Sequence, residues 1–247
     1  MELGEFDRCT DAPAQMRILH RDEQVIAIDK PAGSLSVPGR LGDRAIWQEV
    51  QELAPEALPV HRLDRDTSGV LLFALGKEAH RALSVAFEDR LAEKRYLALC
   101  RGDLAAPTDC KLALVKLRKG GMRVATGRDH GALPSATGFA PLERFGGVTL
   151  IEARPRTGRT HQIRVHLAAI GHALLIDPRY GETEALPASE FEPGAAAADE
   201  LVLARTPLHA AALRVPHPSG QGWLSVESPL PADLARCLEL LRRARRG

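Results

Sequence analysis

Residues 61–69, HRLDRDTSG, form the densest polar run of the chain and lie directly before an apolar run at 70–75. Polar loops at strand ends often carry functional sites, because a rigid strand holds them. Arginines near Asp64 on both sides favour the charged form of its carboxylate, which could then act as a nucleophile at neutral pH. Asp66 fits a turn, since the side chain in Asp-Thr-Ser-Gly accepts hydrogen bonds from nearby backbone N–H groups. The same turn role is the alternative for Asp64.

A second polar run, RPRTGRTHQIR at 154–164, combines four arginines with a glycine and the start of an expected helix. Backbone N–H groups at a helix N-terminus bind phosphate well when arginines lie beside them. Arg164 falls next to the apolar stripe of that helix and could reach a buried carboxylate. The alternative is a basic surface loop, with Arg164 extended along the protein surface.

Tyr96 is one of only two tyrosines and lies in an expected strand. Packing in the core is the ordinary role of a strand tyrosine. The functional alternatives are a ring that stacks on a nucleic-acid base and a phenol that transfers a proton.

Several other chemistries lack their usual signatures. His161 and His166 are separated by five positions, which on a helix turns them about 140° apart, so we expect no metal site. The chain has no Walker loop, no GxGxxG after a strand and no GxSxG elbow. A glycosidase that pairs Asp64 with Asp66 is also disfavoured, because carboxylates two positions apart in a turn are poorly placed to flank a scissile bond.

The pattern of apolar residues predicts an α+β fold with a mixed, largely antiparallel central sheet and flanking helices. The expected helices are at 79–87, at the segment that Thr160 caps and Gly171 ends, and at 231–246. The segment 182–204 mixes proline, glycine, alanine and acids, which favours an exposed excursion. Strands are expected at 24–29, 70–75, 96–101, 111–117, 137–143 and 148–154.

Composition indicates an ordinary globular protein. The 247 residues include 33 Lys plus Arg against 32 Asp plus Glu, and 45% are hydrophobic. The four cysteines are scattered, and no apolar run approaches the length of a membrane span. We therefore expect a cytoplasmic protein without membrane contact.

Positive charge is concentrated in two strips of this nearly neutral chain. Between 111 and 128 there are six basic residues and no acid, and between 154 and 179 there are five basic residues against Asp177 alone. We expect a basic face around the site, with the acids of 182–200 on the opposite side.

Six longer motifs occur in a fixed order along the chain. They are DKPAG at 29–33, HRLDRDTSG at 61–69, EKRYLALCRG at 93–102, TGRTHQIRVHLAAIGH at 157–172, DPRYG at 177–181 and RTPLHAAAL at 205–213. Through these motifs, residues from about 17 to 235 resemble the RluA-type pseudouridine synthases. That family isomerises uridine in RNA to pseudouridine without a cofactor, by detaching the base from the ribose at nitrogen, rotating it and rejoining it through carbon.

The resemblance implies roles for particular residues. Asp64 corresponds to the catalytic aspartate, and Tyr96 to the tyrosine that stacks on the target base and is implicated in proton removal. Arg164 corresponds to the basic residue that pairs with the aspartate, and we expect a bidentate pair that keeps Asp64 charged and fixed. Arg62 matches the arginine that replaces the flipped-out uridine in the RNA helix. The other expected substrate-binding residues are His61, Arg65, Thr67, Arg159 and Ile163.

The resemblance also divides the chain into an N-terminal tail at 1–16, a catalytic domain at 17–235 and a basic helix end at 236–247. The excursion at 182–204 is expected to be an insertion in the domain. Because the first family strand begins by residue 25, we expect no additional N-terminal RNA-binding domain of about sixty residues.

The expected partner is RNA, ribosomal or transfer RNA or both, bound by a monomer without metal, nucleotide or other cofactor. The stretch LSVPGR at 35–40 resembles the compact member of the family that acts on both RNAs. The alternative is an RNA-binding or ribosome-assembly factor that has the fold without the activity.

Overall fold

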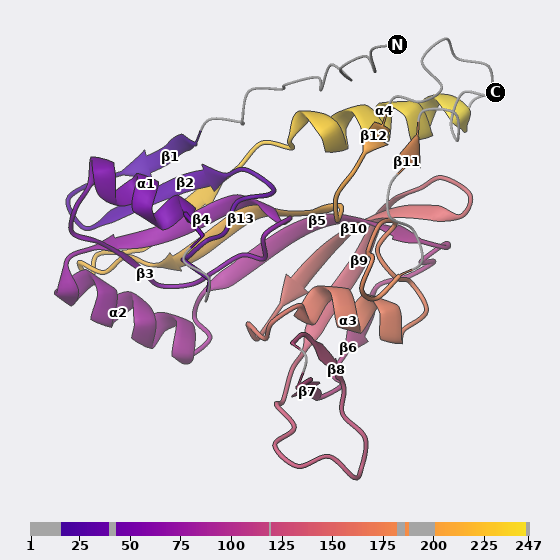
Figure 1. The fold of residues 1–247 in the computed structure, drawn as a ribbon, viewed down its shortest axis with the longest axis horizontal. Helices are drawn as coiled ribbons and strands as arrows, with labels where there is room; N and C mark the ends of the chain where they lie inside the picture. Colours follow the sequence, from indigo (N-terminus) through magenta and orange to yellow (C-terminus); the bar gives the residue numbers. More distant parts are fainter. Residues whose placement is uncertain (1–15, 40–42, 119, 182–185, 188–200, 246–247) are drawn as a thin grey trace, which may run out of the picture.

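One large sheet organises the protein (Figure 1). The computed structural model describes residues 16–39, 43–118, 120–181, 186–187 and 201–245. Ten strands form the sheet in the order β1-β2-β4-β13-β5-β10-β9-β6, with β14 beside β13 and β3 beside β4. Among its described strand pairs, β4 with β13 is parallel and the others are antiparallel. The predicted fold class is therefore confirmed. The strands are β1 (Arg17–Arg21), β2 (Val25–Lys30), β3 (Ala57–Pro59), β4 (Ser68–Leu75), β5 (Glu93–Arg101), β6 (Thr108–Cys110), β9 (Thr137–Arg144), β10 (Val148–Pro155), β13 (Leu208–Pro216) and β14 (Trp223–Glu227).

Helices cover both faces of the sheet, and the alternation of side chains along each strand decides which helix each residue meets. On β4, Leu71 and Phe73 pack against α1, whereas Val70 and Leu72 pack against α2. Both faces of this strand are covered, which explains its continuous apolar sequence. The helices are α1 (Ile46–Leu53), α2 (Lys77–Glu88), α3 (Gln162–Ala169) and α4 (Ala232–Ala244).

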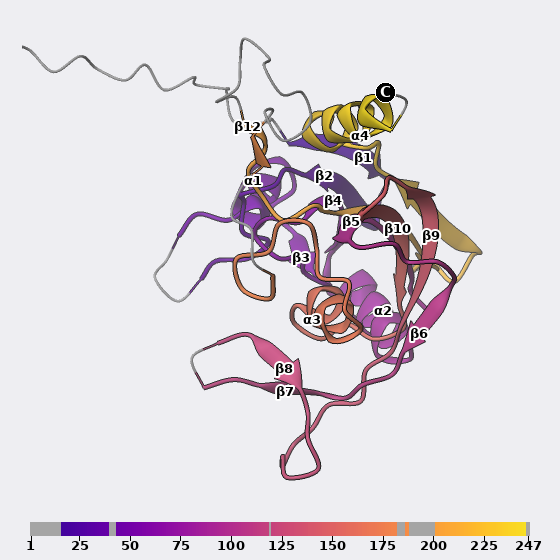
Figure 2. The same cartoon turned by 90° about the vertical axis from the view of Figure 1, so that its right-hand side faces the viewer.

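The other half of the sheet follows the same rule. On β5, Ala98 and Cys100 pack with α3, and Leu99 packs with α4. Figure 2 shows α4 and α3 on opposite sides of this part of the sheet. Tyr96, on the α3 side of β5, packs against both the α1 cluster and the α3 cluster. Its ring therefore lies where the two halves of one face meet.

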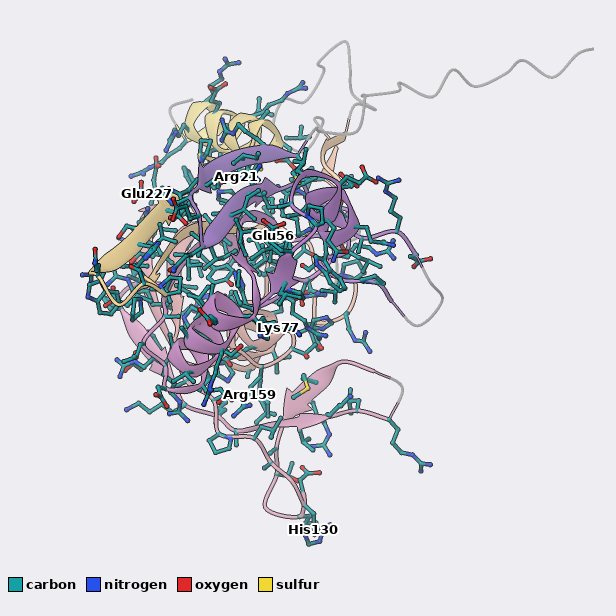
Figure 3. The ribbon with its side chains drawn as sticks, turned by 90° about the vertical axis from the view of Figure 1, so that its left-hand side faces the viewer. Arg21, Glu56, Lys77, His130, Arg159 and Glu227 are labelled. Carbon is teal, nitrogen blue, oxygen red and sulfur yellow. The ribbon has the colours of Figure 1, made fainter. Side chains whose placement is uncertain are left out.

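A basic arm, residues 111–133, extends away from the sheet between β6 and β9 (Figures 1 and 2). It contains a two-stranded hairpin of β7 (Leu114–Lys116) and β8 (Met122–Val124), so the strand expected at 111–117 lies in this arm and outside the central sheet. The base of the arm is fastened by a small apolar cluster of Leu114, Met122 and Val165 of α3. Figure 3 shows His130 at the far tip of the arm.

Two expectations, one about a helix end and one about the excursion, need correction. Thr160 does not cap α3: the cap residue is His161, in the left-handed conformation (φ 52°) and without a side-chain cap bond. The ends of the 182–204 segment are packed, because Leu186 and Val202 are buried beside α4. They belong to a small sheet of β11 (Leu186–Pro187) and β12 (Leu201–Leu203).

One expected domain limit falls inside a helix, and other expected segments lie mostly outside the described residues. α4 runs through the limit at 235 and 236 without interruption, so the basic end belongs to a helix that packs on the sheet. Residues 1–15 and 188–200, which include the expected tail and most of the excursion, lie outside the described residues. No helix within the described ranges is long and apolar enough to cross a membrane.

Candidate active site

Asp64 lies in the loop between β3 and β4, and the side chain of Lys30 hydrogen-bonds to the backbone of this loop. The ammonium nitrogen of Lys30, at the end of β2, donates to the backbone carbonyls of Pro31, Ser34 and Arg65 at 2.8, 2.7 and 2.9 Å. Burial lowers the pKa of Lys30 to about 7, although the charge of Asp66 acts in the opposite direction. Lys30 thus links the turn that follows β2 to the loop that carries Asp64.

Two further contacts fix this loop. The hydroxyl of Ser36 donates to the carbonyl of Leu63 at 2.8 Å and accepts from its N–H at 2.9 Å. The N–H of Thr67 donates to the carbonyl of Asp64 at 3.1 Å. Because main-chain bonds surround Asp64 on both sides, its carboxylate projects from a rigid backbone.

The carboxylate of Asp64 lies in the wall between two cavities. The first, of about 520 Å³, is called the Tyr96 cavity, and the second, of about 600 Å³, the Arg65 cavity. The Asp64 side chain is 22% exposed, and its Oδ2 is 3.8 Å from Nη1 of Arg164 and 3.9 Å from Nε2 of His161. The residues that line both cavities are Arg62, Leu63, Asp64, His161 and Arg164.

Arg164 makes its bidentate pair with Asp177, and this corrects the expectation that the pair would form with Asp64. Nε and Nη2 of Arg164 donate to the two oxygens of Asp177, each at 2.7 Å. Although burial alone would lower it, the pKa of Arg164 is raised by the hydrogen bonds and charge of Asp177 and by the charge of Asp64. Asp177 thus holds the guanidinium in place while its third nitrogen, Nη1, faces Asp64.

Tyr96 lies on β5 of the central sheet, and its side chain lines the Tyr96 cavity. Burial and the negative charge of Asp64 raise the pKa of its phenol above the ordinary value, so the group is neutral at pH 7. Ile163, the second residue of α3, is buried against the same cluster and lines the same cavity. The cavity therefore offers an aromatic ring and an aliphatic side chain near the carboxylate.

Arg62 and Arg159 lie at the mouth of this cavity. Nη2 of Arg62 donates to the hydroxyl of Thr160 at 3.1 Å, which links the Asp64 loop to the start of α3. The N–H of Arg159 donates to Oε1 of Gln162 at 3.1 Å, and its half-buried side chain donates through Nε to the carbonyl of Pro134 at 3.4 Å, beside the basic arm (Figure 3). The two guanidinium groups therefore add positive charge to this edge of the cavity.

The other three expected binding residues have mainly structural contacts. Nε2 of His61 accepts from the N–H of Leu72 at 3.0 Å, and burial lowers the pKa of this histidine to about 3. Its neutral ring stacks on Phe87 in the wall of the Tyr96 cavity. Thr67 is 2% exposed and lines the same cavity. Arg65 lines the other cavity and forms an exposed ion pair with Asp43.

Four residues of the site were not among the expected site residues. Lys94 lines the Tyr96 cavity, and its position two residues before Tyr96 places both on one face of β5, a signal that strand alternation provides. Asp177 and Tyr180 lie in the DPRYG motif, but their spacing indicates no role. For His161, the spacing of histidines bears only on metal binding and does not indicate a contact with Asp64. Within the described ranges no cluster of three or more potential metal-ligating side chains occurs.

Comparison with known proteins shows similarity to one family. Residues 24–169 match the model of the RNA pseudouridylate synthase family. The chain is 38% identical over 233 residues to the ribosomal large subunit pseudouridine synthase C of Escherichia coli K12, covering 92% of this chain and 70% of that protein. It is 34% identical over 246 residues to the protein of the same name from Vibrio cholerae, covering 98% and 72%.

Two solved human structures share the fold. The human RNA pseudouridylate synthase domain containing 1 superposes with a TM-score of 0.71 at 27% identity, covering 100% of this chain and 98% of the other. The human domain containing 4 superposes with a TM-score of 0.74 at 24% identity, covering 92% and 93%. The second comparison bears on the fold alone.

Proposed function

Because the chain belongs to the RNA pseudouridylate synthase family, we propose that it isomerises uridines in RNA with Asp64 as the nucleophile. The observation that carries this proposal is the carboxylate of Asp64, 3.8 Å from a guanidinium and open to a cavity that Tyr96 lines. Since the relatives are named for the large ribosomal subunit, ribosomal RNA in the cytoplasm is the first substrate to test, and transfer RNA the second. We propose that a monomer acts without a nucleotide cofactor.

The Tyr96 cavity suits a nucleotide that has left its helix. Its volume of about 520 Å³ lies within the usual range of roughly 300–1,000 Å³ for small-molecule sites. A flipped-out uracil has lost its stacked neighbours and can restack on the ring of Tyr96. For Arg62, which lines the cavity and is exposed, we propose that its side chain fills the gap that the uridine leaves in the RNA.

The charge of Asp64 also bears on the proton that must leave. Isomerisation breaks the bond from ribose to N1 and forms one to C5, so C5 loses a proton and N1 gains one. While Asp64 is charged, it raises the pKa of Tyr96 and opposes loss of the phenolic proton. If Asp64 bonds to the ribose, that charge is lost only until C5 displaces Asp64 from the ribose carbon. The C5 proton leaves after that step, when Asp64 is charged again, so the phenol of Tyr96 can accept this proton only while it passes its own proton on.

Replacing Tyr96 with phenylalanine tests this division of roles. The ring remains, so we expect the Kd for RNA to change by less than about twofold, whereas loss of the hydroxyl lowers turnover about 100-fold. Release of tritium from RNA labelled at uridine C5 measures turnover, and filter binding measures affinity. If Tyr96→Phe has the turnover of the wild type, Tyr96 has no role in proton transfer and only stacks on the base.

A phosphate contact is expected at Lys94. Its ammonium group lies at the Tyr96 cavity, burial lowers its pKa, and within the described residues no carboxylate lies in ion-pair range of it. A phosphate would compensate for this desolvated charge. Lys94→Met should raise the Kd for RNA about fivefold at 0.1 M salt and reduce the slope of log K against log salt by about 0.7.

Lys77→Met is the matched control. Lys77 is exposed at the start of α2 and lies outside both cavities (Figure 3). Its replacement should leave the slope unchanged, and an equal loss of slope in the two variants would refute a specific contact at Lys94.

The alternative function is an RNA-binding or ribosome-assembly factor without catalysis. Both functions predict salt-sensitive RNA binding, so binding does not separate them. Pseudouridine mapping does: RNA from cells that lack the protein should lose one or a few modified positions, and purified wild-type protein should restore them. A wild-type protein that modifies no position in total RNA would establish the alternative.

A further inference from the structure

His161 lies between the basic arm and Asp64. Its Nδ1 is 2.9 Å from the hydroxyl of Tyr180, and that hydroxyl accepts the backbone N–H of Met122, in β8 of the arm, at 3.0 Å. On the other side of the ring, Nε2 is 3.9 Å from Oδ2 of Asp64. A continuous set of polar contacts therefore leads from the arm to the carboxylate.

These contacts indicate which nitrogen of His161 carries the proton. The Tyr180 oxygen accepts from Met122, and within the described residues its own proton has one acceptor in reach, Nδ1 of His161. If Nδ1 carried the proton, the tyrosine proton would lack a partner at a partly buried site, which is costly. The neutral ring is thus protonated at Nε2, the nitrogen that faces Asp64.

Tyr180 contacts both groups that face the carboxylate, the ring of His161 and the guanidinium of Arg164. Besides its bond to His161, its ring lies under the guanidinium of Arg164, with 5.2 Å from Cζ to the ring centre. The N–H of Tyr180 also donates to Asp177, the partner of Arg164. His161 Nε2 and Arg164 Nη1 both approach Oδ2 of Asp64. Both shortest distances are to this one oxygen, so Oδ1 is the oxygen that lies farther from the two groups.

We propose that His161 is a positioning residue for Asp64, with its tautomer set by Tyr180 and the arm, so that an Nε2–H faces Oδ2 and directs Oδ1 towards the nucleotide. This inference rests on the proposed function. Burial lowers the pKa of His161, Asp64 raises it and Arg164 lowers it further, in agreement with a neutral ring. The distance of 3.9 Å between Nε2 of His161 and Oδ2 of Asp64 is longer than a hydrogen bond. His161 therefore acts on Asp64 through the attraction between its N–H dipole and the negative carboxylate.

The backbone makes asparagine the informative substitution. His161 has φ 52°, a conformation that asparagine adopts more readily than most residues. The short side chain of asparagine can still accept from Tyr180 but has no donor at the position of Nε2. The longer side chain of glutamine returns a donor near that position.

The test combines kinetics with imidazole NMR. We expect His161→Asn to lower kcat about tenfold, with KM within about twofold, and His161→Gln to recover part of the loss. In protein labelled with ¹⁵N at histidine, the signals missing from His161→Asn identify His161 and should show a protonated Nε2. Tyr180→Phe keeps the ring under Arg164 and should shift the Nδ1 signal, which a purely structural role of His161 would not require.

His172→Asn is the matched control, because Nδ1 of His172 bonds the carbonyl of Arg101 outside both cavities and an asparagine amide can replace this bond. It should leave kcat unchanged. A proton on Nδ1 of His161, or a folded His161→Asn protein with the kcat of the wild type, would overturn the proposal. A wild-type protein inactive on RNA would instead refute the proposed function, and the NMR signals would still identify the tautomer.

Discussion

Replacing Asp64 with asparagine is expected to lower kcat/KM for pseudouridine formation by roughly 10⁴-fold or more, the effect of removing a nucleophile. The amide has nearly the shape of the carboxylate, but it carries no charge and does not attack carbon under these conditions. The loop that holds the residue is fixed by main-chain bonds to Lys30 and Ser36, so the substitution should leave the fold intact. The measurement is pseudouridine formation on RNA from cells that lack the protein.

RNA affinity provides the internal control for this variant. Since the basic residues of the cavities are unchanged, the Kd of Asp64→Asn for RNA should remain within about threefold of the wild-type value. Asp66→Asn, two residues further along the same loop, should retain most of the activity, because Asp66 lines only the Arg65 cavity and lies outside the Tyr96 cavity. Equal losses in the two variants would point to a disturbed loop, and an active Asp64→Asn protein would eliminate Asp64 as nucleophile.

The largest effect on stability is expected for Asp177→Asn. Asp177 is 1% exposed and accepts two hydrogen bonds of 2.7 Å from Arg164, whose side chain is 10% exposed. Removing this partner leaves Asp64, at 3.8 Å, as the remaining counter-charge of the buried guanidinium. Breaking a buried pair in this way typically costs about 3–5 kcal/mol. The free energy of unfolding in urea should fall by that amount, and activity should fall with it because Arg164 no longer has a fixed position.

Glu52→Gln is the matched control for this prediction. Glu52 also bonds an arginine at 2.7 Å, but both side chains of that pair, Glu52 with Arg44, are more than 60% exposed. Exposed pairs contribute about 0–1 kcal/mol, because water and salt screen them. A similar loss of stability in both variants would show that burial does not determine how much the pair of Asp177 and Arg164 contributes to the free energy of unfolding.

Much of the fold follows from local patterns. The apolar run at 70–75 predicts a buried strand, and the structure places it in β4, covered by helices on both faces. The expected helix at 79–87 corresponds to α2, because its apolar residues recur at helical spacing and face one cluster. Such patterns are local, so neighbouring residues are sufficient to specify them. The arm is different: its strands are too short for a periodic signal, and its separation from the main sheet is set by contacts with α3.

The sequence predicted which motifs contain the site residues, but it did not predict which side chains form ion pairs with one another. Asp64, Tyr96 and Arg164 lie in recognisable sequence motifs, and strand alternation could have added Lys94. The sequence offered no means of choosing Asp64 or Asp177 as the bidentate partner of Arg164. That choice depends on how α3 sits against the segment at 172–181, where a helix rotation of one residue, about 100°, would turn the guanidinium elsewhere.

By itself, the sequence determined the class of fold, the order of most of its elements and the motifs that carry the chemistry, since these depend on residue type and short-range spacing. Only the tertiary structure decided that Asp177 holds Arg164, that Tyr180 connects the arm to His161, and that the same oxygen of Asp64 is the nearest one to His161 and to Arg164. These are relations between side chains distant in the chain, and differences of an ångström or two decide whether such polar groups interact. Residue identity alone does not contain those distances.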